Sequence, residues 1–423
     1  MNQASPDDER ASSAPDDDAG DGGTPFQDDV DRPGRAVSRW VRPPRLATGE
    51  EREASRLELF YDLAYVLVVA ELAAAFLKDL SWSGAATFAG LFTAMWLAWV
   101  STTLYANRFD TDDVVFRIAQ LVGTAAIAGC AAAATGGLGS TSAQFAACFL
   151  LGRLVLLGLY LRAWRHVPDG RRTIGVYLAT TSTAATLWAV SLLVPPPARF
   201  ILWAVAVAVD AAGPVIATLR GDAAPLHMEH LPERFGLFVI LVLGEMVAAV
   251  VTGVHDAKWS ALPVAVSAIG FVVAAALWWS YFDVASARGN DELQDADEAI
   301  DERHDLYIYG HLPLTLGIAA AGVGLEELVL HPDAELPAPP GWAAIAGIGL
   351  CLLGAGIILA GTHQRLSAMW PWPTVALAPL AAYAVLPIPP ALLVGLLALT
   401  VVIVAITGAR RLAAAGSDVG LSL

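Results

Sequence analysis

Long runs of apolar residues dominate the chain, and short polar segments separate them. Each run holds roughly 18 or more mostly apolar residues, enough for an α-helix to cross a hydrocarbon core about 30 Å thick. The pattern predicts twelve spans, at Leu57–Leu77, Ser83–Tyr105, Val114–Ala134, Ser142–Leu161, Ile174–Val194, Phe200–Leu219, Phe235–Gly253, Ala261–Phe282, Tyr307–Leu330, Trp342–Gly361, Trp372–Leu386 and Ala391–Thr407. We therefore expect an all-α, polytopic integral membrane protein with about twelve transmembrane helices, surrounded by the lipid bilayer.

The basic residues indicate the orientation of these spans. Cytoplasmic loops of membrane proteins hold an excess of Lys and Arg. Most arginines of this chain fall in the segments on the N-terminal side of the membrane, and only Lys78, Arg199 and Lys258 fall on the other side. An even number of spans and this alternation predict that both termini are cytoplasmic.

The polar segments outside the spans are strongly acidic. Residues 1–55 are rich in Asp, Ser, Gly and Pro without apolar periodicity, which predicts a disordered cytoplasmic tail. That tail supplies much of the net charge of −16, so the charge does not identify a partner, and we expect no nucleic-acid partner. Residues 56–411 form the predicted helical domain and 412–423 a short cytoplasmic tail. The acidic insert Asp283–Asp305 is expected to hold a short cytoplasmic helix.

Several ionisable residues lie inside the apolar runs. An acidic or basic side chain at the centre of a membrane helix costs about 2.5–3.5 kcal/mol, so such residues usually face a bundle interior or an aqueous path. At about 1.5 Å per residue they fall in two layers. Those near the midplane are Glu71, Arg153, Asp210 and Glu245. Those near the cytoplasmic end are Glu58, Asp62, Arg117, Arg234 and His311.

The charges of these residues do not balance. Five carboxylates face three arginines, so the surplus must be protonated or matched by a bound cation. Arg153 is too deep to reach the interface, and we expect it to meet Glu71, Asp210 or Glu245 in one internal pocket. Such a pair serves either as a clamp between helices or as part of a proton or ion pathway, and the sequence leaves both open.

A second polar cluster opens the seventh run. His227, His230 and Glu233 follow one another at intervals of three, but Pro232 interrupts them and the spacing of a metallopeptidase is absent. We interpret the histidines as hydrogen-bonded interface residues and expect no metal and no cofactor. Arg234 and Glu245 are eleven residues apart, close to three turns, and so share one side of the helix.

The first and seventh apolar runs show signs of an internal duplication. Sliding the sequence by 174 residues sets Leu63 on Leu237, Leu67 on Leu241 and Glu71 on Glu245. Six spans separate these positions, so two halves at residues 56–219 and 226–411 would have the same orientation. Parallel repeats of this kind occur in secondary transporters.

Three motifs in order resemble the bacterial low temperature requirement protein A family. They are Glu58-Leu-Phe-Tyr-Asp62, the segment from Glu233 to Glu245, and His311-Leu-Pro-Leu-Thr-Leu-Gly317 leading to Glu326. Tyr61 and Ala64 stand where the family more often has Phe and Val. The resemblance covers roughly residues 56–411 and implies a multi-pass protein of the bacterial inner membrane, associated by name with growth in the cold. The family's charged motif positions map to Glu58, Asp62, Glu233, Arg234, Glu245 and His311.

Three kinds of function fit these features. The first is a cation- or proton-coupled transporter of a small solute or ion that uses the intramembrane carboxylates. The second is a lipid-handling protein or enzyme in which the cytoplasmic layer, with His230 and Glu233, holds a headgroup. The third is a structural protein whose ion pairs fix helix packing. The chain has no phosphate-binding loop, nucleophile elbow or zinc-protease helix, which favours transport over catalysis, and we assign no catalytic residue.

Overall fold

A computed structural model describes most of the chain. The described residues are 41–46, 55–110, 112–220, 230–282, 302–333, 339–362 and 371–419. The predicted tail therefore lies almost entirely outside the described residues, as does most of the predicted helix at 283–305. Beyond the helices, the structure has a two-residue antiparallel pair of strands, β1 (Arg45–Leu46) and β2 (Phe109–Asp110).

Twelve α-helices occupy the described residues, one for each predicted span. Six come from the first part of the chain: α2 (Arg56–Lys78), α3 (Trp82–Arg108), α4 (Val114–Ala134), α5 (Ser142–His166), α6 (Arg171–Ser191) and α7 (Ala198–Leu219). Six come from the second part: α8 (His230–Asp256), α9 (Ala261–Trp279), α11 (Glu302–Leu330), α12 (Pro339–Thr362), α14 (Pro371–Val385) and α15 (Pro390–Val419). The prediction of a polytopic, all-α membrane protein is confirmed.

Ten of the described helices are long and apolar enough to cross a membrane, and α6 and α14 are not among them. α14 has 15 residues. α6 is rich in Thr, and its hydroxyl groups donate to the helix's own carbonyls, as Thr183 does to Ala179 O and Thr186 to Ser182 O, both at 2.8 Å. Such internal bonds satisfy hydroxyl groups where water is absent.

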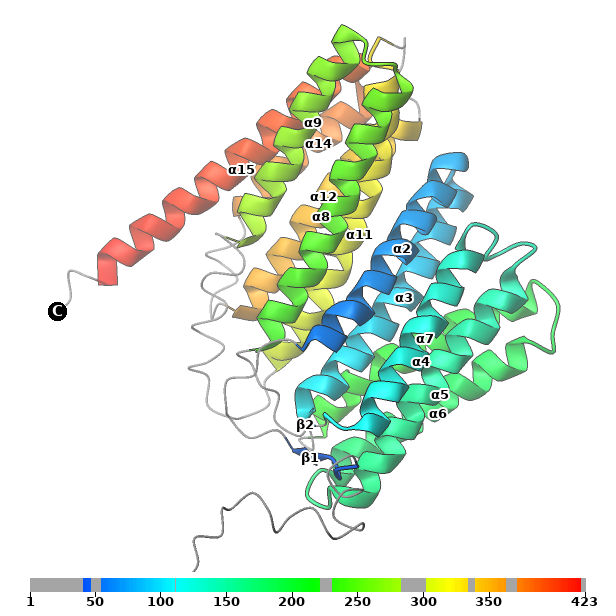
Figure 1. Ribbon diagram of the computed structural model, residues 1–423. Coiled ribbons are helices and arrows are strands. Elements are labelled where there is room, and N and C mark those ends of the chain that lie inside the picture. Colours follow the sequence, from blue (N-terminus) through cyan, green and yellow to red (C-terminus); the bar gives the residue numbers. More distant parts are fainter. Residues whose placement is uncertain are drawn as a thin grey trace, which may run out of the picture. The chain divides into compact units, whose positions relative to one another are not determined.

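The helices pack as two groups of six (Figure 1). In the first group α2 contacts α3 and α4. The next helices, α5, α6 and α7, each contact the helix that precedes them in the chain, and α7 also contacts α3. In the second group α8 contacts α9 and α11. The next helices, α12, α14 and α15, each contact the described helix that precedes them, and α15 also contacts α9. The order of neighbours is the same in both groups. α2, α3 and α7 of the first group meet α8 and α11 of the second.

α11 and α12 lie against each other with almost no side chain between them. The glycines responsible recur every seven residues, at Gly310, Gly317 and Gly324 on α11 and at Gly347 and Gly354 on α12. A Cβ atom on Gly317 would lie 2.4 Å from Cys351 N and from Gly347 O. Small residues let helix backbones approach in this way in membranes, where van der Waals contact replaces hydrophobic burial as the source of stability.

Candidate functional site

Two carboxylates, a guanidinium group and an indole meet where α2, α3 and α8 come together. We call Glu58, Asp62, Trp99 and Arg234 the Asp62–Arg234 cluster. Arg234 Nη2 donates to Asp62 Oδ1 at 3.0 Å, and Trp99 Nε1 donates to the same oxygen at 2.8 Å. Arg234 Nη1 lies 3.5 Å from Glu58 Oε2. All four side chains are buried. The structure thus brings together three of the charged residues predicted near the cytoplasmic end.

The local sequence positions these groups. Ser55 caps α2 by accepting a hydrogen bond from Glu58 N at 3.2 Å, which starts the helix just before the two acids. Glu58 and Asp62 are four residues apart, so both face the same side of α2. On α8, Pro232 stands in the first turn, where its missing N–H has no helical acceptor to lose, and Arg234 follows it.

One oxygen of the cluster is left without a donor. Asp62 is 2% exposed, and its Oδ2 accepts no hydrogen bond from the part of the chain that the structure describes. A buried charged oxygen without a partner is costly, and it is also the atom on which a proton can be placed without breaking the bonds that Oδ1 accepts. The geometry therefore marks Asp62 as the group of the cluster best placed to change its protonation state.

An aromatic shell joins the cluster to His311. The Phe235 ring lies edge-on to Trp99, with centroids 5.1 Å apart, and 4.5 Å from the His311 ring. His311 Nδ1 lies 2.7 Å from Tyr307 O, a carbonyl that can only accept, so Nδ1 carries the proton. Nε2 lies 2.9 Å from Tyr281 OH, and in a neutral ring it accepts the hydrogen bond from that hydroxyl group. Both ring nitrogens are bound by the protein, and α11 continues as a helix through Pro313.

A second buried ion pair lies within the first group of helices. Arg153 Nη1, on α5, donates to Asp210 Oδ2, on α7, at 3.2 Å, and Arg153 is 2% exposed. This confirms one of the three partners expected for Arg153. We call these two residues the Arg153–Asp210 pair.

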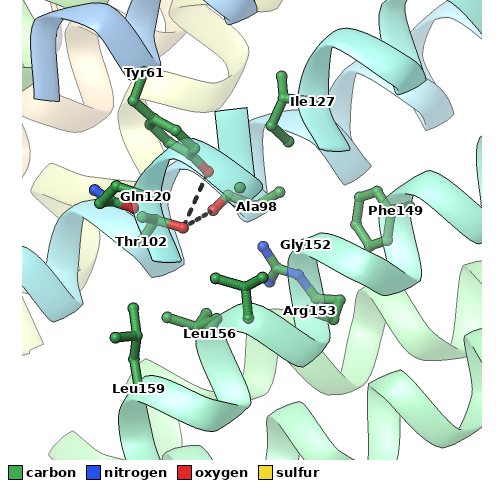
Figure 2. Close-up of a pocket in the computed structure, with 12 residues that line it drawn as sticks. Tyr61, Ala98, Thr102, Gln120, Ile127, Phe149, Gly152, Arg153, Leu156 and Leu159 are labelled. Carbon is green, nitrogen blue, oxygen red and sulfur yellow. Dashed lines mark hydrogen bonds between the residues drawn. The ribbon is translucent and has the colours of Figure 1, made fainter. Parts of the chain in front are cut away.

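The guanidinium group of Arg153 borders a small internal cavity. Figure 2 shows it pointing toward Tyr61, Thr102 and Gln120, which also line the space. Tyr61 OH and Thr102 Oγ1 are hydrogen-bonded at 3.2 Å. The cavity measures about 10 Å³, which is close to the least volume that holds one water molecule. Polar and apolar side chains both line it, and it is too small for a solute.

The structure does not bring the other midplane acids to Arg153. Glu71 is exposed and lies on the same face of α2 as the exposed Leu63 and Leu67, while Glu245 is half-buried on α8. Neither has an ion pair with a described residue. The expectation that four midplane charges converge on one pocket is therefore wrong for these two, because Glu71 lies on the exposed face of α2 and Glu245 lies on α8, which belongs to the other group of helices.

Three further predicted residues lie apart from the cluster. Arg117 is exposed and forms a two-bond ion pair with Asp112, at 2.8 and 2.9 Å, so it does not line an internal pathway. Glu233 is exposed, although it is next to Arg234 in the sequence. The side chain of His230 lies outside the described residues.

Sequence reasoning missed several of the polar partners. Trp99 is the closest donor to Asp62, but a Trp inside an apolar run looks like any other hydrophobic residue. Asp113 was missed as well: it caps α4 through Phe116 N at 2.9 Å and receives two hydrogen bonds from Arg162, at 3.0 and 2.5 Å. The Asp at the start of the third run was a detectable capping signal; its pairing with Arg162 was not.

The two ion pairs differ in what they connect. The Arg153–Asp210 pair joins α5 and α7, which belong to the same group of helices. The Asp62–Arg234 cluster joins α2 to α8, across the interface between the groups. A change of charge at Asp210 acts within one group, whereas a change of charge at Asp62 acts on the contact between the two groups.

Comparison with known proteins gives a family and one relative. The family described as "Bacterial low temperature requirement A protein (LtrA)" matches residues 53–407. An uncharacterized protein of Rhizobium meliloti (strain 1021) is 28% identical over 310 residues, which are 70% of this chain and 73% of that relative. The residues that match the family include both buried ion pairs and all twelve described helices, except for the C-terminal end of α15.

Proposed function

Because this chain belongs to the bacterial low temperature requirement A family of membrane proteins, we propose that it is a proton-coupled secondary transporter of a small solute. In this proposal, protonation of Asp62 controls the contact between the two groups of helices. The observation that carries it is the buried ion pair between Asp62 and Arg234, which links the groups at one end of their interface.

The chemistry of the pair suits such a role. A proton on Asp62 removes the nearer of the two carboxylate charges that Arg234 faces and leaves only Glu58, at 3.5 Å, and a buried guanidinium group that has lost its closest partner is costly to keep out of water. Protonation of Asp62 therefore raises the free energy of the state in which α2 and α8 are joined by this pair. A transporter of two repeats works by rocking one repeat against the other, and a charge pair across that interface couples the rocking to a proton.

The arrangement of the helices supports the same proposal. Both groups have the same order of neighbours, as expected if residues 56–219 and 226–411 are repeats of one unit. α2 and α8 occupy equivalent places in the two groups, so the cluster lies between equivalent helices. The Arg153–Asp210 pair moves with the first group and acts in this proposal as a clamp within it.

Distance measurements between the groups test this proposal. Nitroxide labels are attached at Ser83 on α3 and Asp333 beside α11, both exposed, after replacement of Cys130, Cys148 and Cys351 by Ala. Electron–electron double resonance in lipid nanodiscs then reports the separation of the labels between pH 5 and pH 9. We expect two populations of distances whose ratio changes with pH.

Neutral variants identify the group responsible. Asp62→Asn imitates the protonated acid and is expected to hold the ratio at its low-pH value throughout the range. Asp210→Asn is the matched control, since it removes a buried acid within one group and leaves the pH dependence in place. Distances that do not change with pH, or that change equally in the Asp62→Asn variant, would contradict the proposal.

A further inference from the structure

The interface between the two groups of helices is hollow at the end far from the Asp62–Arg234 cluster. A cavity of about 770 Å³ lies between the C-terminal end of α2 and the N-terminal half of α3 on one side and α11 and α12 on the other. We call it the apolar groove. Residues that line it include Phe76, Phe88, Ala89, Leu316, Ala320 and Ala346.

Small side chains on the facing helices explain why the groove is empty of protein. Ala85 and Ala89 on α3 face Ala320 on α11 and Ala346 and Gly347 on α12. Within the second group the glycines of α11 and α12 close the space between those two helices, so the hollow is confined to the boundary between the groups. The cavity is a product of the local sequence on both walls.

The lining of the groove excludes ions and strongly polar solutes. No charged side chain of the described residues lines it, and its one hydroxyl group, that of Ser81, already accepts a hydrogen bond from Gly84 N at 3.1 Å and bonds with Ser83 Oγ at 2.8 Å. Trp82 and Trp342 meet across its mouth with ring centroids 6.4 Å apart. Trp is enriched where a membrane protein meets the headgroup layer.

We infer that the apolar groove binds one acyl chain of a bilayer phospholipid. An apolar cavity open to its surroundings in a membrane-spanning protein is in contact with lipid, and hydrocarbon fills such a surface where water does not. Its volume falls within the range of about 300–1,000 Å³ typical of pockets that enclose a small molecule. The Trp pair marks the level at which the chain would join its headgroup.

Photochemical labelling with a lipid probe tests the inference. The full-length protein is reconstituted in vesicles of phosphatidylethanolamine and phosphatidylglycerol that contain a trace of phosphatidylglycerol with a diazirine at the end of one acyl chain. After illumination, mass spectrometry of peptides locates the adducts. We expect adducts concentrated on the groove residues of α3, α11 and α12.

Filling the groove provides the decisive comparison. Ala89→Phe and Ala346→Phe place a ring in the cavity and are expected to reduce labelling of the groove peptides at least five-fold. Ala86→Phe is the matched control, because Ala86 is exposed on the same helix as Ala89 and does not line the groove. It is expected to label like the parent protein, and thermal unfolding of all three variants identifies any that fail to fold.

Two results would overturn the inference. One is equal labelling of the groove peptides in the parent and in both filled variants. The other is native mass spectrometry in which the filled variants lose a dimer while lipid adducts are unchanged, which would make a second copy of the chain the occupant. Labelling needs no pH gradient, so its outcome is independent of the proposed transport.

Discussion

Tyr61 and Asp62 are adjacent in the sequence but serve different parts of the molecule. Successive residues of an α-helix point about 100° apart. The Tyr61 hydroxyl group accordingly faces the small cavity beside Arg153, inside the first group of helices, whereas Asp62 faces Arg234 on α8. Side-chain direction therefore decides which part of the molecule each of the two residues contacts.

The hydrogen bond from Trp99 to Asp62 should be measurable as stability. Trp99→Phe removes the donor and keeps a ring, and hydrogen bonds to charged groups contribute about 1.5–3 kcal/mol. Trp96→Phe makes the same change of volume on the same helix, but the Trp96 indole N–H has no partner among the described residues. We expect unfolding in detergent to show a larger loss for Trp99→Phe, and equal losses would contradict the assigned role of the bond.

The Arg153–Asp210 pair should behave as a structural clamp. Arg153→Met leaves a buried carboxylate alone, and breaking a buried pair costs about 3–5 kcal/mol. Replacing both residues, Arg153→Met with Asp210→Leu, removes both charges and is expected to restore most of the free energy of unfolding. Folded protein from the double variant that still responds to pH in the distance measurement supports the clamp; failure of the double variant to recover argues against it.

At the scale of elements, close contact between two helices is decided by a few positions. The glycines of α11 and α12 recur every seven residues on both helices. A Cβ atom at these positions would meet backbone atoms of the other helix, so only glycine allows the two helices to lie this close. Gly347 belongs to two features, since it touches the backbone of α11 and also lines the apolar groove. Tight packing within the second group and a hollow beside it therefore come from the same two helices.

A methyl group on Gly317 should be far more damaging than one on Gly158. Gly317→Ala places a Cβ at 2.4 Å from Cys351 N, and overpacking of this kind typically costs about 1–3 kcal/mol. At Gly158, on the exposed side of α5, nothing lies within 4 Å of the added atom, so Ala there is expected to be neutral or to stabilise the helix by up to about 1 kcal/mol. Thermal unfolding of the two purified variants provides the comparison.

At the scale of the whole molecule, each group of six helices closes on itself. α7 returns to α3 in the first group and α15 returns to α9 in the second. Most helix neighbours are therefore found within a group, and α2, α3, α7, α8 and α11 make most of the contacts between groups. An arrangement with strong internal packing and a smaller shared interface suits movement of one group against the other.

Dividing the chain between the groups should leave both pieces able to assemble. We expect residues 1–225 and 226–423, expressed together as separate chains, to purify as a complex, because the cut crosses no contact between helices of one group. A cut between α4 and α5, at residue 138, separates two helices that pack together and is expected to prevent assembly. Arg234→Ala in the first pair should lower the yield of the complex, since it removes the charge that joins α8 to α2. Failure of the 225/226 pair to assemble would show that the groups are not independent units.

The sequence by itself determined the number, type and approximate limits of the helices. The physical reason is that membrane insertion depends on the hydrophobicity of one continuous stretch, which is a local property. The same property shows which charges lie inside a span, and so the apolar runs alone identify Asp62, Arg153 and Asp210 as intramembrane charges and place Arg234 directly before the seventh run.

Only the tertiary structure decided which of these charges meet. Glu71 and Asp210 look alike in the sequence, each an acid near the middle of an apolar run, yet one is exposed and the other bonds to Arg153. Pairing depends on which helices are neighbours and on the rotation of each about its axis, and both arise from packing between residues far apart in the chain. For the same reason the contribution of Trp99 and the apolar groove became visible only once α2 and α3 lay beside α8, α11 and α12.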